Sequence, residues 1–128
     1  MNIKSSQTLV KEALIEITTI TPSQALEMSN NNECNLIDIR DAVELQKLGR
    51  IENSFHISRG LLEFSIHPES AFVQNNKLDL NKEIVLFCAA GGRSALAAKT
   101  LKEMGFKKVS HVEGGFGSMS NSGFKVIK

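Results

Sequence analysis

Hydrophobic residues follow two different spacings along this chain, and each spacing predicts one kind of secondary structure. Near the N-terminus the apolar positions fall on one face of a helix, and they are Leu9, Val10, Ala13, Leu14 and Ile17. This pattern predicts an amphipathic helix over residues 5–17. Two later runs, Leu36–Ile39 and Ile84–Phe87, are short, apolar and partly β-branched, which is typical of buried strands.

Turn and capping signals divide the rest of the chain into alternating helices and strands. Thr21 and Pro22 predict the start of a short helix that runs to about Met28. The further predicted elements are a helix over Ala42–Leu48, a strand over Phe55–Ile57, mixed helix and loop over Arg59–Asn76, a helix over Ser94–Leu101 and a strand over Val109–Val112. This alternation indicates an α/β fold with a mainly parallel central sheet, helices on both faces, and a site at the carboxyl ends of the strands.

Residues 88–94, with the sequence CAAGGRS, join the apolar run at 84–87 to the helix predicted after it. A thiol at such a turn faces unpaired N–H groups and the positive end of the helix dipole, so the pKa of Cys88 should be lowered. Gly91 and Gly92 let the backbone amides point inward around an anion, and Arg93 adds a permanent cation. The residues expected to surround the sulfur are Ala89, Ala90, Gly91, Gly92, Arg93 and Ser94. Cys88 alone could be a buried, unreactive cysteine, but this loop favours a nucleophile.

Four motifs, in this order along the chain, resemble those of the rhodanese-like family and especially its small single-domain sulfurtransferases. They are residues 36–41 with Glu44, residues 49–57, residues 88–94, and residues 105–106 with 112–116. The resemblance covers about residues 19–120 and implies one rhodanese-like domain over residues 1–128, with the helix at 5–17 as an appendage. The chain departs from the family pattern at Met119, where tryptophan is common, and at Glu52 and Asn53, where Pro-Gly is common.

The resemblance implies an enzyme of the thiosulfate sulfurtransferase type. Such an enzyme moves a sulfane sulfur from thiosulfate or a related anionic donor to cyanide, a thiol or a protein acceptor. Cys88 would carry the sulfur as a persulfide, and Cys88 and Arg93 would be the catalytic residues. No cofactor and no metal are expected.

Two other functions share this loop chemistry. A domain of this family can carry sulfur without turnover or bind a protein, with the N-terminal helix or the tail at 118–128 as a docking element. Cysteine-dependent phosphatases and arsenate reductases also use a thiolate in a loop that ends in arginine. Their signature has five residues between the two, whereas four separate Cys88 from Arg93, which favours a sulfur atom over a phosphate.

Three charged residues elsewhere are candidates for supporting roles. Asp38 and Arg40 come at the end of a predicted strand, where Asp38 could brace the loop or pair with an arginine. Alternatively, Asp38 caps the following helix and Arg40 pairs with Glu44 on the surface. Arg59 follows another predicted strand, so it could bind anionic donors at the pocket mouth or be a solvated loop residue.

Composition and charge indicate the class of protein, although they say little about its reaction. With 128 residues, 41% hydrophobic residues and a formal net charge of +1, the chain suits one domain with its own core. The charge balance gives no basic surface for a nucleic acid. No apolar run is long enough to span a membrane and the N-terminus has no secretory signal pattern, so a soluble cytoplasmic protein is expected.

The cysteines and histidines suggest little further chemistry. A disulfide between Cys34 and Cys88 is disfavoured because a chain of this size needs no covalent staple and a reactive thiol works in a reduced compartment. His56, His67 and His111 lack the close spacing of a metal site. His56 or His111 could act as a base toward Cys88, as in cysteine hydrolases, but a histidine that ends a strand is more often structural.

Overall fold

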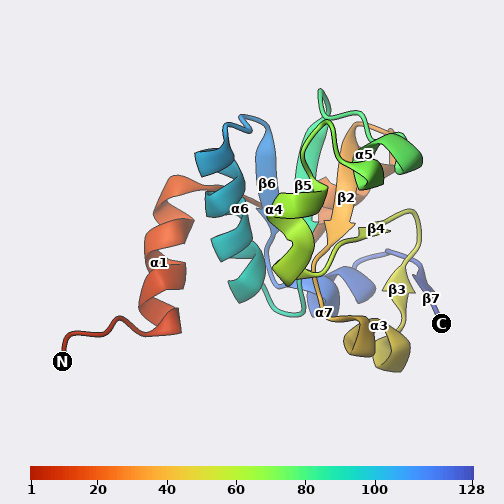
Figure 1. Cartoon of the computed structure of the whole chain (residues 1–128). Helices are drawn as coiled ribbons and strands as arrows, with labels where there is room; N and C mark the ends of the chain where they lie inside the picture. The colour runs from red at the N-terminus through yellow and green to blue at the C-terminus, as the bar shows by residue number, and fades with distance from the viewer.

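The computed structural model describes residues 1–128 and has a central sheet of five parallel strands (Figure 1). Their order across the sheet is β1 (Thr18–Ile20), β6 (Val109–Val112), β5 (Glu83–Phe87), β2 (Cys34–Asp38) and β4 (Phe55–His56). Thr19 lies opposite His111 at one edge, and Ile37 lies opposite Phe55 at the other. The predicted α/β fold with a parallel sheet is therefore confirmed.

Helices cover both faces of this sheet. One layer holds α4 (Leu62–Ser65), α5 (Ala71–Asn76) and α6 (Gly92–Met104), and the other holds α2 (Pro22–Asn30) and α7 (Gly115–Ser120). On the central strand β5, Ile84 and Leu86 belong to the first core, whereas Val85 and Phe87 belong to the second. Successive side chains of a strand point to opposite faces, so a strand buried on both sides is a continuous apolar run.

The N-terminal helix α1 (Ser6–Glu16) packs against α6 at the outside of the molecule (Figure 1). Ser5 caps it by accepting a hydrogen bond from the backbone N–H of Thr8 at 3.1 Å. Ala13 is its one buried residue, so most of this helix is in contact with solvent. None of the helices is long and apolar enough to cross a membrane.

The remaining elements lie near the carboxyl end of the sheet. They are α3 (Ala42–Leu48), the short 3-10 helix η1 (Arg59–Leu61) and a two-stranded antiparallel pair of β3 (Arg50–Ile51) with β7 (Val126–Ile127). The C-terminal tail, expected to be available for docking, is therefore held within the fold by the pairing of β7 with β3. This pairing fixes the segment that leads from α3 into the sheet.

Candidate active site

Cys88 lies where the structure joins β5 to α6, at the carboxyl end of the central strand (Figure 1). Cys88 is almost completely buried, with 1% of its surface exposed. The sulfur accepts hydrogen bonds from the backbone N–H of Gly91 at 3.1 Å and of Ser94 at 3.4 Å, and the Ser94 hydroxyl lies 3.6 Å away. Gly91 has a φ of +111°, which turns the loop amides toward the sulfur. The strand-to-helix turn predicted for Cys88 is confirmed.

These contacts determine the ionisation of the Cys88 thiol. Burial raises the pKa of the thiol, because a charge is poorly solvated inside the protein. Hydrogen bonds from the Ser94 hydroxyl and from the backbone amides of Ser94, Gly91 and Ala90 act in the opposite direction. Their combined effect is larger, so the pKa of Cys88 is lowered below its ordinary value. The loop is therefore built to stabilise an anionic sulfur.

The loop is held from behind by the start of α7. The backbone N–H of Phe116 donates to the carbonyl of Cys88 at 2.8 Å, and that of Gly117 donates to the carbonyl of Ala89 at 3.3 Å. Gly115 has a φ of +58°, and a Cβ on it would lie 2.9 Å from the carbonyl carbon of Ala89 and closer still to the carbonyl oxygen of Cys88. A glycine is required here because the two backbones touch.

Arg93 points from the loop to α3 and forms a bidentate ion pair with Glu44. Its Nη1 and Nη2 donate to the two carboxylate oxygens at 2.8 and 2.9 Å. These hydrogen bonds hold the pKa of Glu44 at about 2, although partial burial opposes them, and the carboxylate raises the pKa of Arg93. The alternative prediction of a surface pair between Arg40 and Glu44 is wrong, because Glu44 binds Arg93 instead. The Arg93 side chain is 38% exposed, so its cation lies at the rim.

Asp38 and Arg40 form an ion pair whose side chains are completely buried. Arg40 Nη2 donates to Asp38 at 2.7 Å and to the Gly49 carbonyl at 2.9 Å. The guanidinium carbon lies 3.9 Å from the centre of the Phe116 ring. Asp38 is therefore not an exposed helix cap, and Asp41 has the cap position of α3 instead. Arg40 thus packs on Phe116, whose backbone N–H binds the carbonyl of Cys88.

Arg59 is not brought to the loop. Its guanidinium donates to Glu63 at 2.8 Å and to the Thr100 hydroxyl at 3.4 Å. Thr100 is eight residues beyond Gly92 on α6, which corresponds to about 12 Å along the helix axis. These contacts favour the interpretation of Arg59 as a surface residue over the interpretation that it binds anionic donors at the pocket mouth.

His111 is connected to Cys88 through one side chain. The Ser94 hydroxyl lies 2.8 Å from His111 Nδ1, and His111 Nε2 lies 3.0 Å from the Thr19 hydroxyl. The other candidate base, His56, bonds the carbonyl of Arg40 at 2.7 Å and has no such connection. The sequence singled out His111 only as a histidine that ends a strand and could act as a base toward Cys88. Its contacts join β1, α6 and β6, so no local pattern could predict them.

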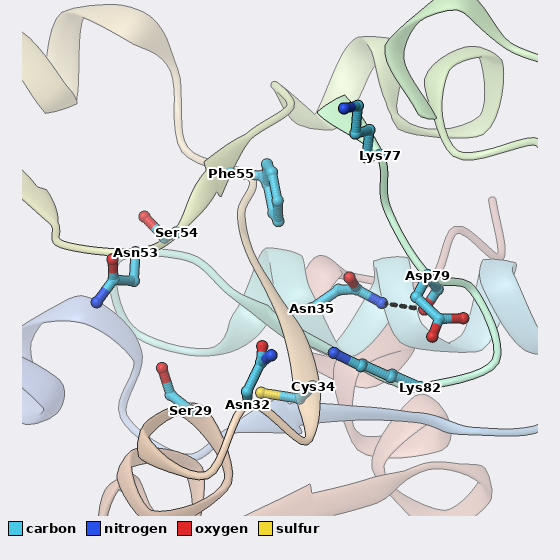
Figure 2. Close-up of a pocket in the computed structure, with 10 residues that line it drawn as sticks. All are labelled: Ser29, Asn32, Cys34, Asn35, Asn53, Ser54, Phe55, Lys77, Asp79 and Lys82. Atoms are coloured by element: carbon cyan, nitrogen blue, oxygen red, sulfur yellow. Dashed lines mark hydrogen bonds between the residues drawn. The ribbon is translucent and has the colours of Figure 1, made fainter. Parts of the chain in front are cut away.

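The second cysteine lies at the opposite end of the sheet. Cys34 begins β2 beside a polar cavity of about 580 Å³, which Lys77, Lys82 and Phe55 also line (Figure 2). Burial, together with nearby carboxylates, raises the pKa of Cys34 to about 11, so its thiol stays protonated. No three His, Cys, Asp or Glu side chains lie close enough together to hold a metal ion. The largest cavity is thus remote from Cys88, and the candidate site is the loop around that cysteine.

Comparison with known protein families and sequences agrees with this geometry. The model of the rhodanese-like domain family matches residues 21–122, which include the whole loop. The thiosulfate sulfurtransferase GlpE of Glaesserella parasuis is 34% identical over 99 residues, covering 77% of this chain and 82% of that protein.

Solved structures show the same architecture with two different descriptions. A Rhodopseudomonas palustris protein of unknown function, described as a possible tyrosine phosphatase, is 37% identical with a TM-score of 0.86, covering 99% of this chain and 97% of that one. The polysulfide-sulfur transferase of Wolinella succinogenes is 34% identical with a TM-score of 0.73, covering 93% and 84%.

Proposed function

Because this chain belongs to the rhodanese-like domain family, we propose that it is a sulfurtransferase in which Cys88 carries the transferred sulfur as a persulfide. The observation that carries the proposal is the ring of hydrogen-bond donors around the Cys88 sulfur. A persulfide is an anion, and backbone amides fixed in advance around an anion stabilise it without reorganisation. The position at the N-terminus of α6 adds the favourable end of the helix dipole.

In the first half-reaction, the Cys88 thiolate attacks the outer sulfur of thiosulfate. A new S–S bond forms, the S–S bond of thiosulfate breaks, and sulfite leaves with the bonding electron pair. The product is the Cys88 persulfide anion. Arg93, at the rim of the loop and held by Glu44, supplies positive charge toward the oxygens of the departing sulfite.

In the second half-reaction, an acceptor attacks the outer sulfur of the persulfide. Cyanide would leave as thiocyanate, and a thiol would leave as a new persulfide, with the Cys88 thiolate restored in both cases. The two half-reactions share one enzyme intermediate, so a ping-pong kinetic pattern is expected. Ala89 and Ala90 are small, and Ala90 is exposed, which leaves room for a bulky donor or acceptor.

A phosphatase is the second candidate because a structurally similar protein is described as a possible tyrosine phosphatase. Four residues separate Cys88 from Arg93, one fewer than in the phosphatase signature. This shorter loop favours sulfur transfer.

The test is the intact mass of the protein after thiosulfate and again after cyanide. The wild type should gain one sulfur atom and then lose it as thiocyanate, and Cys88→Ser should gain none. Cys34→Ser is the matched control and should behave as wild type, because its thiol is at the other end of the sheet. Thiocyanate limited to one equivalent per chain would indicate a carrier. Absence of sulfur uptake from both thiosulfate and polysulfide, with hydrolysis of p-nitrophenyl phosphate, would indicate the phosphatase.

A further inference from the structure

A continuous row of hydrogen-bonding side chains leads from the buried sulfur to the surface of the sheet edge. The Cys88 thiol reaches the Ser94 hydroxyl at 3.6 Å, that hydroxyl reaches His111 Nδ1 at 2.8 Å, and His111 Nε2 reaches the Thr19 hydroxyl at 3.0 Å. Cys88, Ser94 and His111 are each at most 2% exposed, whereas Thr19 is an exposed residue on the edge strand β1. The row thus has one buried end and one end in water.

We propose that His111 is a positioning residue that acts through Ser94: it orients the Ser94 hydroxyl to donate a hydrogen bond to the Cys88 sulfur anion, and the same row gives the thiol proton a path to solvent at Thr19. The proposal rests on the proposed function, since the anionic sulfur is the reactive species there. It gives His111 a role distinct from a hydrolytic base, because no imidazolium has to persist.

The protons along the row balance in both states. In the thiol state, Cys88 S–H donates to Ser94, and Nε2–H of His111 donates to Thr19. The Ser94 O–H donates to Nδ1 of His111 at 2.8 Å, which is the nearer of its two acceptors, since the Gly91 carbonyl lies at 3.2 Å. Each group then passes one proton to the next, and the last proton leaves Thr19 for water. Every bond of the row is now reversed: Thr19 donates to Nε2, Nδ1–H donates to Ser94, and Ser94 donates to the sulfur anion. His111 ends neutral, with its proton on the other ring nitrogen.

The surroundings of His111 suit a neutral ring that exchanges tautomers. Burial lowers the pKa of the imidazole, and the carboxylate of Glu113 opposes this effect only in part. Both ring nitrogens have a hydroxyl partner, and a hydroxyl donates or accepts equally well. Any buried imidazole needs a partner on each nitrogen. The feature that distinguishes His111 is the identity of its partners, because Ser94 contacts the Cys88 sulfur and Thr19 is exposed.

The experiment is a pH titration of the Cys88 thiolate by its ultraviolet absorbance. The chain contains no tyrosine and no tryptophan, so no phenol ionisation or indole absorbance overlaps the absorbance of the thiolate. The second thiol, Cys34, has a pKa of about 11 and titrates separately. Because this measurement needs no sulfur donor, it tests the row independently of sulfur transfer.

Four variants give the expected pattern. His111→Leu should raise the pKa of Cys88 by about one, which is what loss of a hydrogen bond to a charged group implies. His111→Asn keeps a donor and an acceptor near Ser94 and should recover part of that shift. Thr19→Val keeps the β-branched shape and should raise the pKa by a smaller amount. Thr18→Val, on the same exposed strand but outside the row, should leave it unchanged.

The outcomes separate the two proposals. An unchanged pKa of Cys88 in both His111→Leu and Thr19→Val would overturn the role of His111, even if the protein transfers sulfur. The predicted pKa pattern without any persulfide after thiosulfate or polysulfide would leave the row intact and refute the proposed function. Thr19→Val keeps the test valid if His111→Leu does not fold, because Thr19 is an exposed residue and valine keeps its shape.

Discussion

Replacing Gly115 with alanine tests how α7 holds the loop around Cys88. The substitution should lower the unfolding free energy in two ways, through an unfavourable backbone conformation and through overlap with the loop backbone. An alanine at a φ of +58° costs about 1–2 kcal/mol, since L side chains disfavour the left-handed region. Its Cβ would also lie 2.9 Å from the carbonyl of Ala89, and the backbone there cannot rotate away as a flexible side chain would. Overlap of this kind costs about 1–3 kcal/mol. The total expected loss of unfolding free energy is therefore about 2–5 kcal/mol.

Two other glycines separate these costs. Gly105 has a φ of +111° with nothing near its Cβ position, so Gly105→Ala should show a backbone cost without overlap. That backbone cost should exceed the one at Gly115, because +111° lies outside the left-handed well that +58° occupies. Gly60 has neither a positive φ nor a neighbour within 4 Å, so Gly60→Ala should stay within about 0.5 kcal/mol of wild type. Urea unfolding measures all three variants. If Gly115→Ala lost no more than the backbone cost of about 1–2 kcal/mol, the close approach of α7 to the loop would have no energetic consequence and the reasoning would be refuted.

The other predictions concern the two ion pairs. Asp38→Asn should lower the unfolding free energy by about 3–5 kcal/mol because it leaves the Arg40 charge buried without a counter-charge, and Arg40 Nη1 already lacks a partner; unchanged urea unfolding would contradict this. The Glu44–Arg93 pair is partly exposed, so Glu44→Gln should cost no more than about 1 kcal/mol at neutral pH. Because the pKa of Glu44 is lowered to about 2, the contribution of its charge is fully present above pH 4.5 and is lost as the pH falls toward 2. The stability difference between wild type and Glu44→Gln should therefore narrow over that range, and a constant difference would argue against the pair.

The parts of the structure that depend on residues close together in the sequence could be predicted from it. The helix Ala42–Leu48 and the strand Val109–Val112 have their predicted ends, and Thr21 caps α2 as expected. The turn around Cys88 belongs to the same class, because its glycines and the helix that follows are local features. Local signals also place Cys88 at the carboxyl end of a parallel strand.

Contacts between distant segments could not be predicted in the same way. Glu44 and Arg93 are 49 positions apart, and either could have found another partner of opposite charge. Asp38 is followed by residues that suit a helix start, so capping and burial with Arg40 could be distinguished only once the strand order was known. The two-residue strands β3 and β7 carry too few residues for a periodic pattern. Their pairing depends on the register of the whole fold.

The hydrogen bonds from Phe116 and Gly117 to the Cys88 loop have a consequence for synthesis on the ribosome. Since these donors come 28 or more positions after the thiol, the loop emerges before the segment that fixes it. A nascent chain that stops short of Gly115 carries the cysteine without its rear support. The rear support of the loop is therefore completed only when residues 115–117 pack against it, whereas the backbone amides of Gly91 and Ser94 that bond the sulfur emerge soon after the thiol.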